Sequence, residues 1–253
     1  MRNQEVSTIE QEKSKNTFRL LDAVMIALFA ALAYVAVWVL RIPVGPMFVH
    51  LGNLTVVTAA LLLGGWQGGL AGAIGMGLFD LMNGYASTAP KTIILKFMIG
   101  FITGLVYAAL RRRKKFPTIP LVALGIVALV AAGCITTYVL TGAGFSFLTA
   151  LMVILSAVIG LLCLLFAFLG ARMNHKLAAA VVGASCGMVF NLLGEAAYEF
   201  VSQLLLGSAF GTAVTMAVTS QASTLINVLI SVIGGVALFL PLEKPFSKIV
   251  PRR

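Results

Sequence analysis

Charged residues are scarce in this sequence. Only 10% of its 253 residues are Asp, Glu, Lys or Arg, whereas 60% are hydrophobic. A typical soluble domain has about 25% charged residues, so the composition excludes an ordinary soluble protein and places most of the chain in a lipid bilayer. The net charge of +10 does not indicate a nucleic-acid partner, because the basic residues cluster between apolar segments, as membrane-flanking charges do.

The motifs of several enzyme classes are also missing. The sequence has no G-x-x-x-x-G-K-[ST] loop and no H-E-x-x-H motif, and we expect its two histidines, His50 and His175, on opposite sides of the membrane. The segment Gly183–Gly187 matches G-x-S-x-G, but that motif needs a strand-to-helix turn and a nearby base, and this segment lies in an apolar run. We therefore expect no enzyme activity, no catalytic residue, no metal and no cofactor.

Cysteines are few and scattered. Cys134, Cys163 and Cys186 lie in three different apolar runs, with a spacing that fits neither a zinc site nor a disulfide framework. We interpret them as small core residues.

Long apolar segments make up most of the remaining sequence. About 20 helical residues cross the hydrocarbon core of a bilayer, so the pattern predicts an all-α, polytopic transmembrane helix bundle. We expect about eight spans, at residues 18–40, 53–64, 66–84, 91–110, 120–141, 147–171, 178–206 and 217–240. The predicted organisation is an N-terminal tail (1–17), one transmembrane domain (18–243) that includes a hydrophobic hairpin (117–175), and a C-terminal tail (244–253).

The basic residues predict the orientation of these spans. With the N-terminus inside, 15 of the 18 Lys and Arg residues fall in the two tails and in the loops at 111–115 and 172–176. Cytoplasmic loops are enriched in Lys and Arg, so we expect both termini in the cytoplasm and an even number of spans.

Four ionisable residues interrupt the apolar stretches: Asp80, Lys96, Glu195 and Glu199. Charge within a bilayer is costly and commonly marks a substrate or ion pathway. The alternative is a structural network, in which Asp80 pairs with Lys91 or Lys96.

One helix face carries two of these acids. Asn191, Glu195 and Glu199 are spaced at i, i+4 and i+8 and so share a face. Carboxylates this close repel each other, so either one is protonated or a cation or donor lies nearby. Lys96 and a bound substrate are both candidates for that role.

The loop Arg41–Asn53 follows the first span and contains two prolines, two glycines, Phe48 and His50. Such a stiff loop could cover a pocket as a lid. The alternative is an ordinary turn in which Phe48 anchors the chain at the membrane interface.

Small residues recur at helical spacing in several spans. Ala23, Ala27 and Ala31 make one face of the first span smooth, which suits either internal packing or docking of another membrane protein. We interpret the pairs Gly68/Gly72, Gly100/Gly104 and Gly183/Gly187 as packing within the protein.

Residues 20–110 resemble a known family. The stretches that carry the resemblance are Leu51-Gly52-Asn53, Leu61-Leu62-Leu63-Gly64-Gly65, Gly68-Gly69, Gly72-Ala73-Ile74-Gly75, Asp80-Leu81, Gly84-Tyr85-Ala86, Ala89-Pro90 and Thr92-Ile93-Ile94-Leu95-Lys96. They look like the substrate-binding S components of energy-coupling factor (ECF) vitamin transporters, and are most similar to the branch for riboflavin, pyridoxine or hydroxymethylpyrimidine.

The resemblance implies a high-affinity subunit in a bacterial-type plasma membrane. Such a subunit captures a water-soluble vitamin or related molecule on the outer face, under the loop after the first helix. It then docks through its alanine face to a T subunit that is bound to two cytoplasmic ATPases. S components usually have six helices, so residues 117–175 look inserted, and Asn53 stands where an acid often follows Leu-Gly.

Together the residues and the resemblance predict a substrate site formed by Phe48, His50, Asn53, Asp80, Tyr85, Lys96, Asn191, Glu195 and Glu199, with partner docking at Ala23, Ala27 and Ala31. Three other functions remain open. They are a self-sufficient proton-coupled secondary transporter using Glu195 or Glu199, a membrane hydrolase using Ser185, and an accessory subunit without a ligand.

Overall fold

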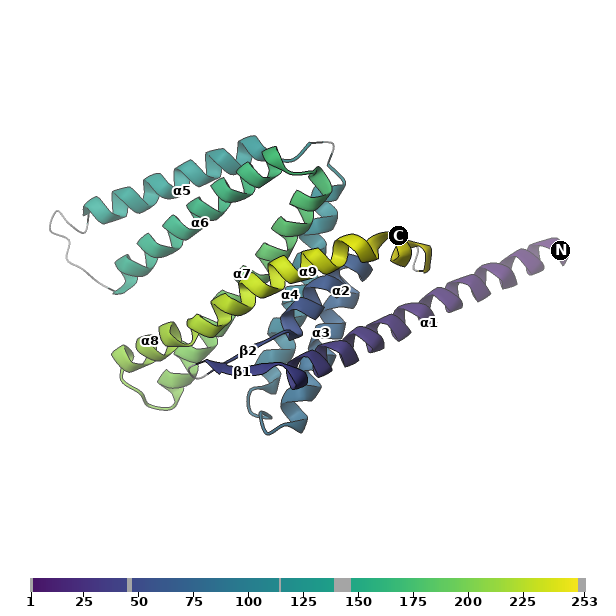
Figure 1. The fold of residues 1–253 in the computed structure, drawn as a ribbon, viewed down its shortest axis with the longest axis horizontal. Coiled ribbons are helices and arrows are strands. Elements are labelled where there is room, and N and C mark those ends of the chain that lie inside the picture. Colours follow the sequence, from purple (N-terminus) through teal and green to yellow (C-terminus); the bar gives the residue numbers. More distant parts are fainter. Residues whose placement is uncertain (1, 45–46, 114, 139–146, 250–253) are drawn as a thin grey trace. The chain divides into compact units, whose positions relative to one another are not determined.

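The computed structural model describes residues 2–44, 47–113, 115–138 and 147–249 (Figure 1). Its helices are α1 (Arg2–Val39), α2 (Gly52–Leu63), α3 (Gly65–Met82), α4 (Ala89–Arg111), α5 (Thr118–Tyr138), α6 (Phe147–Arg172), α7 (His175–Leu205), α8 (Phe210–Thr219) and α9 (Gln221–Ile249). Two short strands, β1 (Arg41–Val44) and β2 (Met47–His50), form an antiparallel hairpin. The predominantly helical prediction is confirmed, and the expectation of a purely α protein is corrected by this hairpin.

Within the described residues, four segments are long and apolar enough to cross a membrane: Leu20–Val39, Ala89–Arg111, His175–Leu205 and Ser223–Ile249. Gly52–Leu63 and Gly160–Arg172 are shorter apolar helices. A membrane-embedded helix bundle is supported, while the number of eight spans and the orientation of the termini stay predictions.

Several helix boundaries differ from the prediction. Helix α1 extends back through the polar tail to Arg2, and α9 continues to Ile249, inside the predicted C-terminal tail. Both extensions contain Glu and Lys, which favour helix even outside a membrane. The predicted span 217–240 corresponds to the end of α8 and most of α9, which are separated at Ser220. The predicted end of the fifth span, residue 141, lies outside the described residues.

The chain divides into two compact units. The first unit comprises Met1–Ala108 and Ala180–Arg253, and the second comprises Ala109–Ala179. In the second unit α5 and α6 pack against each other, and a Cβ added at Gly125 or Gly160 would lie 2.9 or 2.7 Å from a leucine side chain of the opposite helix. This unit contains the segment 117–175 that the sequence marks as a hydrophobic hairpin.

In the first unit, glycines let the helix backbones approach closely. A Cβ at Gly100 of α4 would meet the backbone nitrogen of Gly69 in α3. Added Cβ atoms at Gly183 and Gly187 of α7 would lie 2.8 and 2.6 Å from backbone oxygens of α4. The prediction of internal small-residue packing is therefore confirmed at these positions. As a result, α4 brings its polar side chains within reach of both α3 and α7.

The segment Gly183–Gly187 lies within α7. It therefore lacks the strand-to-helix turn that a nucleophilic serine of this motif requires.

Two glycines with positive φ shape the turns that flank α3. Gly64 has φ 109° between α2 and α3, and Gly84 has φ 88° in the turn that leads to α4. Residues with a Cβ rarely adopt these angles, so glycine permits the abrupt reversal from α2 to α3.

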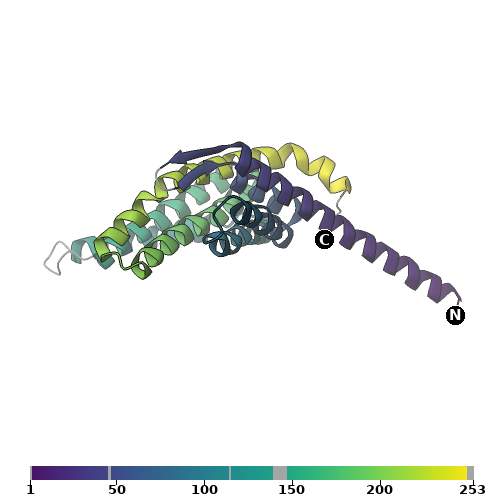
Figure 2. The ribbon, with the colours of Figure 1, turned by 90° about the horizontal axis from the view of Figure 1, so that it is seen from below.

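The β1–β2 hairpin replaces the predicted loop between α1 and α2. Arg41 pairs with His50 and Val44 with Met47, and β2 lies against α9 (Figure 2). Pro43 lies within β1, at an edge position where its missing N–H is tolerated.

Candidate substrate-binding site

A cavity of about 260 Å³ lies within the first unit. Its wall is built from α1, β2, α2, α3, the α3–α4 turn, α4, α7 and α9. The lining residues are Val37, Met47, Phe48, His50, Asn53, Met76, Phe79, Asp80, Tyr85, Thr88, Lys91, Thr92, Lys96, Asn191, Glu195, Tyr198, Glu199, Thr224 and Asn227. All nine residues predicted for a substrate site line this cavity, and their role in binding stays a prediction.

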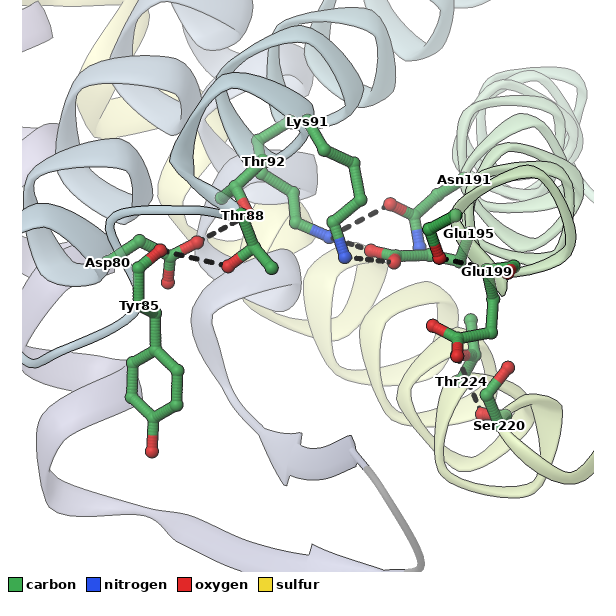
Figure 3. A network of polar contacts seen from close by, with 12 residues as sticks. Asp80, Tyr85, Thr88, Lys91, Thr92, Asn191, Glu195, Glu199, Ser220 and Thr224 are labelled. Atoms are coloured by element: carbon green, nitrogen blue, oxygen red, sulfur yellow. Dashed lines mark hydrogen bonds and ion pairs between the residues drawn. The ribbon is translucent and has the colours of Figure 1, made fainter. Parts of the chain in front are cut away.

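Two lysines of α4 meet one acid of α7 at the cavity wall (Figure 3). Glu195 accepts from Lys91 Nζ at 2.7 Å through Oε2 and from Lys96 Nζ at 3.2 Å through Oε1. Lys96 also donates to Asn191 Oδ1 at 2.9 Å. These side chains are at most 10% exposed, so the ion pairs lie in a region of low dielectric constant. Of the alternatives left open by the sequence, Lys96 does lie beside Glu195, and Lys91 is a second lysine that was not expected there.

Asp80 and Glu199 flank this cluster without joining its ion pairs. Asp80 Oδ2 accepts from Thr92 Oγ1 at 2.5 Å, and Glu199 Oε1 accepts from Gln203 Nε2 at 3.0 Å. The alternative in which Asp80 pairs with Lys91 or Lys96 is not found among the described residues, because both lysines bind Glu195 instead. The other carboxylate oxygen of Asp80 and of Glu199 has no partner in the described part of the chain.

The β1–β2 hairpin is fastened to α9 by one side chain. Asn227, which is 5% exposed, accepts from the backbone N–H of His50 at 3.0 Å and donates to the backbone oxygen of Phe48 at 2.8 Å. Backbone groups two residues apart point to the same edge of a strand. The Asn227 amide can therefore hydrogen-bond both groups on the free edge of β2, as a neighbouring strand would. The hairpin thus holds Phe48 and His50 at the cavity.

Aromatic rings form one side of the cavity. Tyr85 stacks on Phe79 with a centroid separation of 6.4 Å and an interplanar angle of 13°, and Phe48 meets Tyr85 edge-on at 5.7 Å. The guanidinium carbon of Arg41, in β1, lies 5.4 Å from the Phe48 centroid and 5.6 Å from that of Phe79. Cation–π attraction of this kind stabilises the hairpin against the rings of α3 and the following turn.

Two polar side chains face the cavity with unused hydrogen-bonding capacity. Asn53 is 1% exposed, and its Oδ1 has no partner in the described residues. His50 Nδ1 accepts from the Gly52 N–H at 3.2 Å, which assigns the proton of the neutral ring to Nε2. Burial, aided by the positive charge of Lys96, lowers the pKa of His50 to about 3, so its ring is neutral at physiological pH.

The predicted docking face on α1 is exposed. Ala23, Ala27 and Ala31 are each exposed, whereas Ala30 and Ala33, on other faces of α1, are buried. The smooth stripe is therefore not used for packing among the described residues, and docking at this face stays a prediction.

Sequence reasoning missed part of the site. Lys91 was considered only as a partner for Asp80, and Asn227 and Thr224 were not singled out at all. A signal for Thr224 and Asn227 was present, because both are polar residues in the apolar run of the last span. Among the described residues, no group of three His, Cys, Asp or Glu side chains is placed to hold a metal ion.

A family model described as ECF-type riboflavin transporter, S component, matches residues 17–150. The match extends beyond residues 20–110 into the start of α6, and so includes part of the segment 117–175 that we interpreted as inserted. No curated protein and no solved structure matches the chain significantly. The family match covers more than half of the sequence and includes the alanine face, the hairpin and the α3 and α4 walls of the cavity. This chain belongs to the ECF-type riboflavin transporter S component family.

Proposed function

We propose that this protein is the membrane-embedded substrate-binding subunit of an ECF-type importer in a bacterial-type plasma membrane. It captures a water-soluble vitamin or related small molecule on the outer face and delivers it inward with a T subunit and two cytoplasmic ATPases. One observation carries the proposal. A chain of this family has a cavity whose wall contains the buried amide oxygen of Asn53, which has no partner among the described residues.

The arrangement around the cavity supports binding without chemistry. Buried polar groups are normally hydrogen-bonded, so an unpaired Asn53 oxygen at a cavity wall is explained by a ligand that supplies the partner. The β1–β2 hairpin supplies a cover, and the lysine–glutamate cluster fixes the opposite wall. The absence of a phosphate-binding loop from the sequence agrees with ATP hydrolysis by separate subunits.

The direct test is to purify the full chain in mild detergent and identify any co-purified small molecule by mass spectrometry. A stoichiometric vitamin-like compound supports the proposal. A folded protein that contains no small molecule and binds no member of a vitamin panel would contradict it.

Transport assays separate this proposal from a proton-coupled carrier. The binding subunit takes up substrate only when the T subunit and ATPases are present, whereas a self-sufficient carrier takes it up alone and stops when an uncoupler is added. Glu195 is a poor candidate for a proton carrier, because both of its oxygens are engaged by lysines. Glu199, with one unused oxygen, is the residue that a carrier mechanism would require.

The alanine face gives a second test of the partners. Ala27 is exposed at the centre of the face, so Ala27→Trp should prevent co-purification with the T subunit and leave ligand binding unchanged. Ile94→Trp is the matched control, because Ile94 is a 62% exposed residue of α4 outside that face. Normal assembly of the Ala27 variant with the T subunit would show that the alanine face is only a lipid-facing surface.

A further inference from the structure

The second unit, residues 109–179, carries charge of only one sign. It contains seven Lys and Arg residues and no Asp or Glu. All seven lie in two short stretches, 111–115 and 172–176, which flank the hairpin of α5 and α6. Positive charge therefore gathers where the hairpin begins and ends, and the unit has no carboxylate to offset it.

Ring packing holds these two stretches together. A Cβ added at Gly170, in the last turn of α6, would collide with the ring of Phe116. Phe116 also meets the ring of His175 edge-on at 6.1 Å, and His175 Nε2 lies 2.8 Å from the backbone oxygen of Arg113. The start of α5 and the end of α6 thus lie at the same end of the hairpin (Figure 1). Their basic residues form one group, here called the basic cluster: Arg111, Arg112, Arg113, Lys115, Arg172 and Lys176.

The basic cluster is accessible. Arg112, Arg113, Lys115 and Arg172 are exposed, and none of these four takes part in an ion pair among the described residues. The guanidinium carbon of Arg172 lies 5.3 Å from the centroid of Phe168, a ring of α6 that is itself 56% exposed. A cation of the cluster therefore borders an exposed apolar surface.

The sides of the hairpin next to the cluster are apolar. Up to Arg172, α5 and α6 contain no charged residue. Large apolar side chains are exposed on both helices: Ile119, Ile126 and Val130 on α5, and Ile154, Val158, Leu161 and Leu165 on α6. A free anion or an acidic soluble protein would neutralise the cluster and leave these side chains in water. A phospholipid with an anionic headgroup meets both needs, because its acyl chains cover the apolar sides while its phosphate contacts the cations.

We propose that the basic cluster binds the headgroups of anionic phospholipids, with their acyl chains against α5 and α6. Arginine binds phosphate oxygens through two parallel N–H groups, and lysine adds a compact point charge. The inference is independent of the candidate substrate site, which lies in the first unit. It gives the hydrophobic hairpin a role of its own, as the part of the chain that selects its surrounding lipid.

Native mass spectrometry of the full chain in detergent tests the choice of lipid. The probes are phosphatidylglycerol and phosphatidylcholine with identical acyl chains, so that only the headgroup differs. We expect phosphatidylglycerol to bind about tenfold more tightly or better. Equal affinity for the two lipids would overturn the inference. Displacement of phosphatidylglycerol by an equal concentration of soluble glycerol phosphate would also overturn it, because the site would then be one for a free anion.

A pair of variants locates the bound lipid. Arg112→Gln/Lys115→Gln removes two charges from the basic cluster and should weaken phosphatidylglycerol binding about 30-fold. Lys244→Gln/Lys248→Gln is the matched control, because it removes two exposed positive charges from α9 in the first unit. The control should bind the lipid as the unmodified protein does. Equal losses in the two variants would show a general effect of net charge and overturn the assignment.

A third variant separates charge from folding. Arg112→Lys/Lys115→Arg exchanges the two residues and keeps both charges, so it should retain the preference for phosphatidylglycerol. Loss of the preference in this variant would overturn the inference, because the headgroup charge would then not be what the cluster recognises.

Discussion

Replacing Asn227 with leucine should release the β1–β2 hairpin from α9. The side chain makes two hydrogen bonds to the edge of β2, at 3.0 Å to His50 and 2.8 Å to Phe48, and leucine has a similar size without either bond. A neutral hydrogen bond contributes about 1 kcal/mol net, so the closed hairpin loses about 2 kcal/mol relative to an open one whose backbone groups are hydrated. At 1.4 kcal/mol for each factor of ten, the ratio of closed to open hairpin falls about 30-fold.

Hydrogen–deuterium exchange read by mass spectrometry measures this ratio without a ligand. Amides in a peptide covering residues 41–50 should exchange about 30-fold faster in Asn227→Leu than in the unmodified protein, because exchange follows the population of the open form. Affinity for ligand should fall by up to the same factor, since only the closed form is competent to bind.

Ser231→Ala provides the matched control. Ser231 lies one helical turn further along α9, is 0% exposed, and has a hydroxyl without a partner in the described residues. Its replacement should leave hairpin exchange unchanged. Equal exchange rates in the Asn227 variant and the control would refute the reasoning, because they would show that the two bonds do not hold the hairpin closed.

Three further predictions follow from the site and its packing. Glu195→Gln should lower the melting temperature sharply, since removing one partner of a buried ion pair costs about 3–5 kcal/mol. Glu199→Gln should leave the melting temperature unchanged and weaken ligand binding. A larger drop in melting temperature for Glu199→Gln than for Glu195→Gln would contradict a structural role for Glu195 and a ligand-binding role for Glu199. Gly100→Ala should disrupt folding, because its Cβ would collide with the α3 backbone. A Cβ at Gly133 meets open space, so Gly133→Ala should elute as a single symmetric peak in size-exclusion chromatography, whereas Gly100→Ala should not. His50, in β2, has its pKa lowered to about 3 by burial and is close to 6.5 when unfolded, so the unfolded chain binds the proton first and stability should fall as pH drops from 6.5 towards 3. Melting curves of His50→Gln over that range should be flatter, and an unchanged slope would show that another group titrates.

The sequence was sufficient to single out four of the charged residues that line the cavity. Asp80, Lys96, Glu195 and Glu199 stood out because charge in an apolar stretch is costly, and all four line the cavity. The shared face of Asn191, Glu195 and Glu199 followed from helical periodicity alone. Glycine pairs predicted close helix packing, which the contacts across α3, α4 and α7 confirm.

The pairing of these residues could not be predicted. Asp80 and Lys91 lie close in the sequence, yet both lysines reach 104 and 99 residues along the chain to Glu195. Local spacing shows which residues share one face of a helix. It does not show which neighbouring helix that face packs against, because that depends on the rotation and depth of every neighbouring helix. The sequence likewise did not show that Asn227 binds the β1–β2 hairpin. Its partners are backbone groups that lie 177 and 179 residues away.

The sequence by itself determined that this is a helical membrane protein of a substrate-binding family. Composition and periodicity are properties of each segment, and lipid forces apolar segments into helices whatever their neighbours are. Only the tertiary structure decided that α4 and α7 form a lysine–glutamate wall, that α9 fastens the hairpin, and that the predicted site residues line one cavity. Those outcomes depend on distances between segments far apart in the chain, which are set by the packing of the whole first unit.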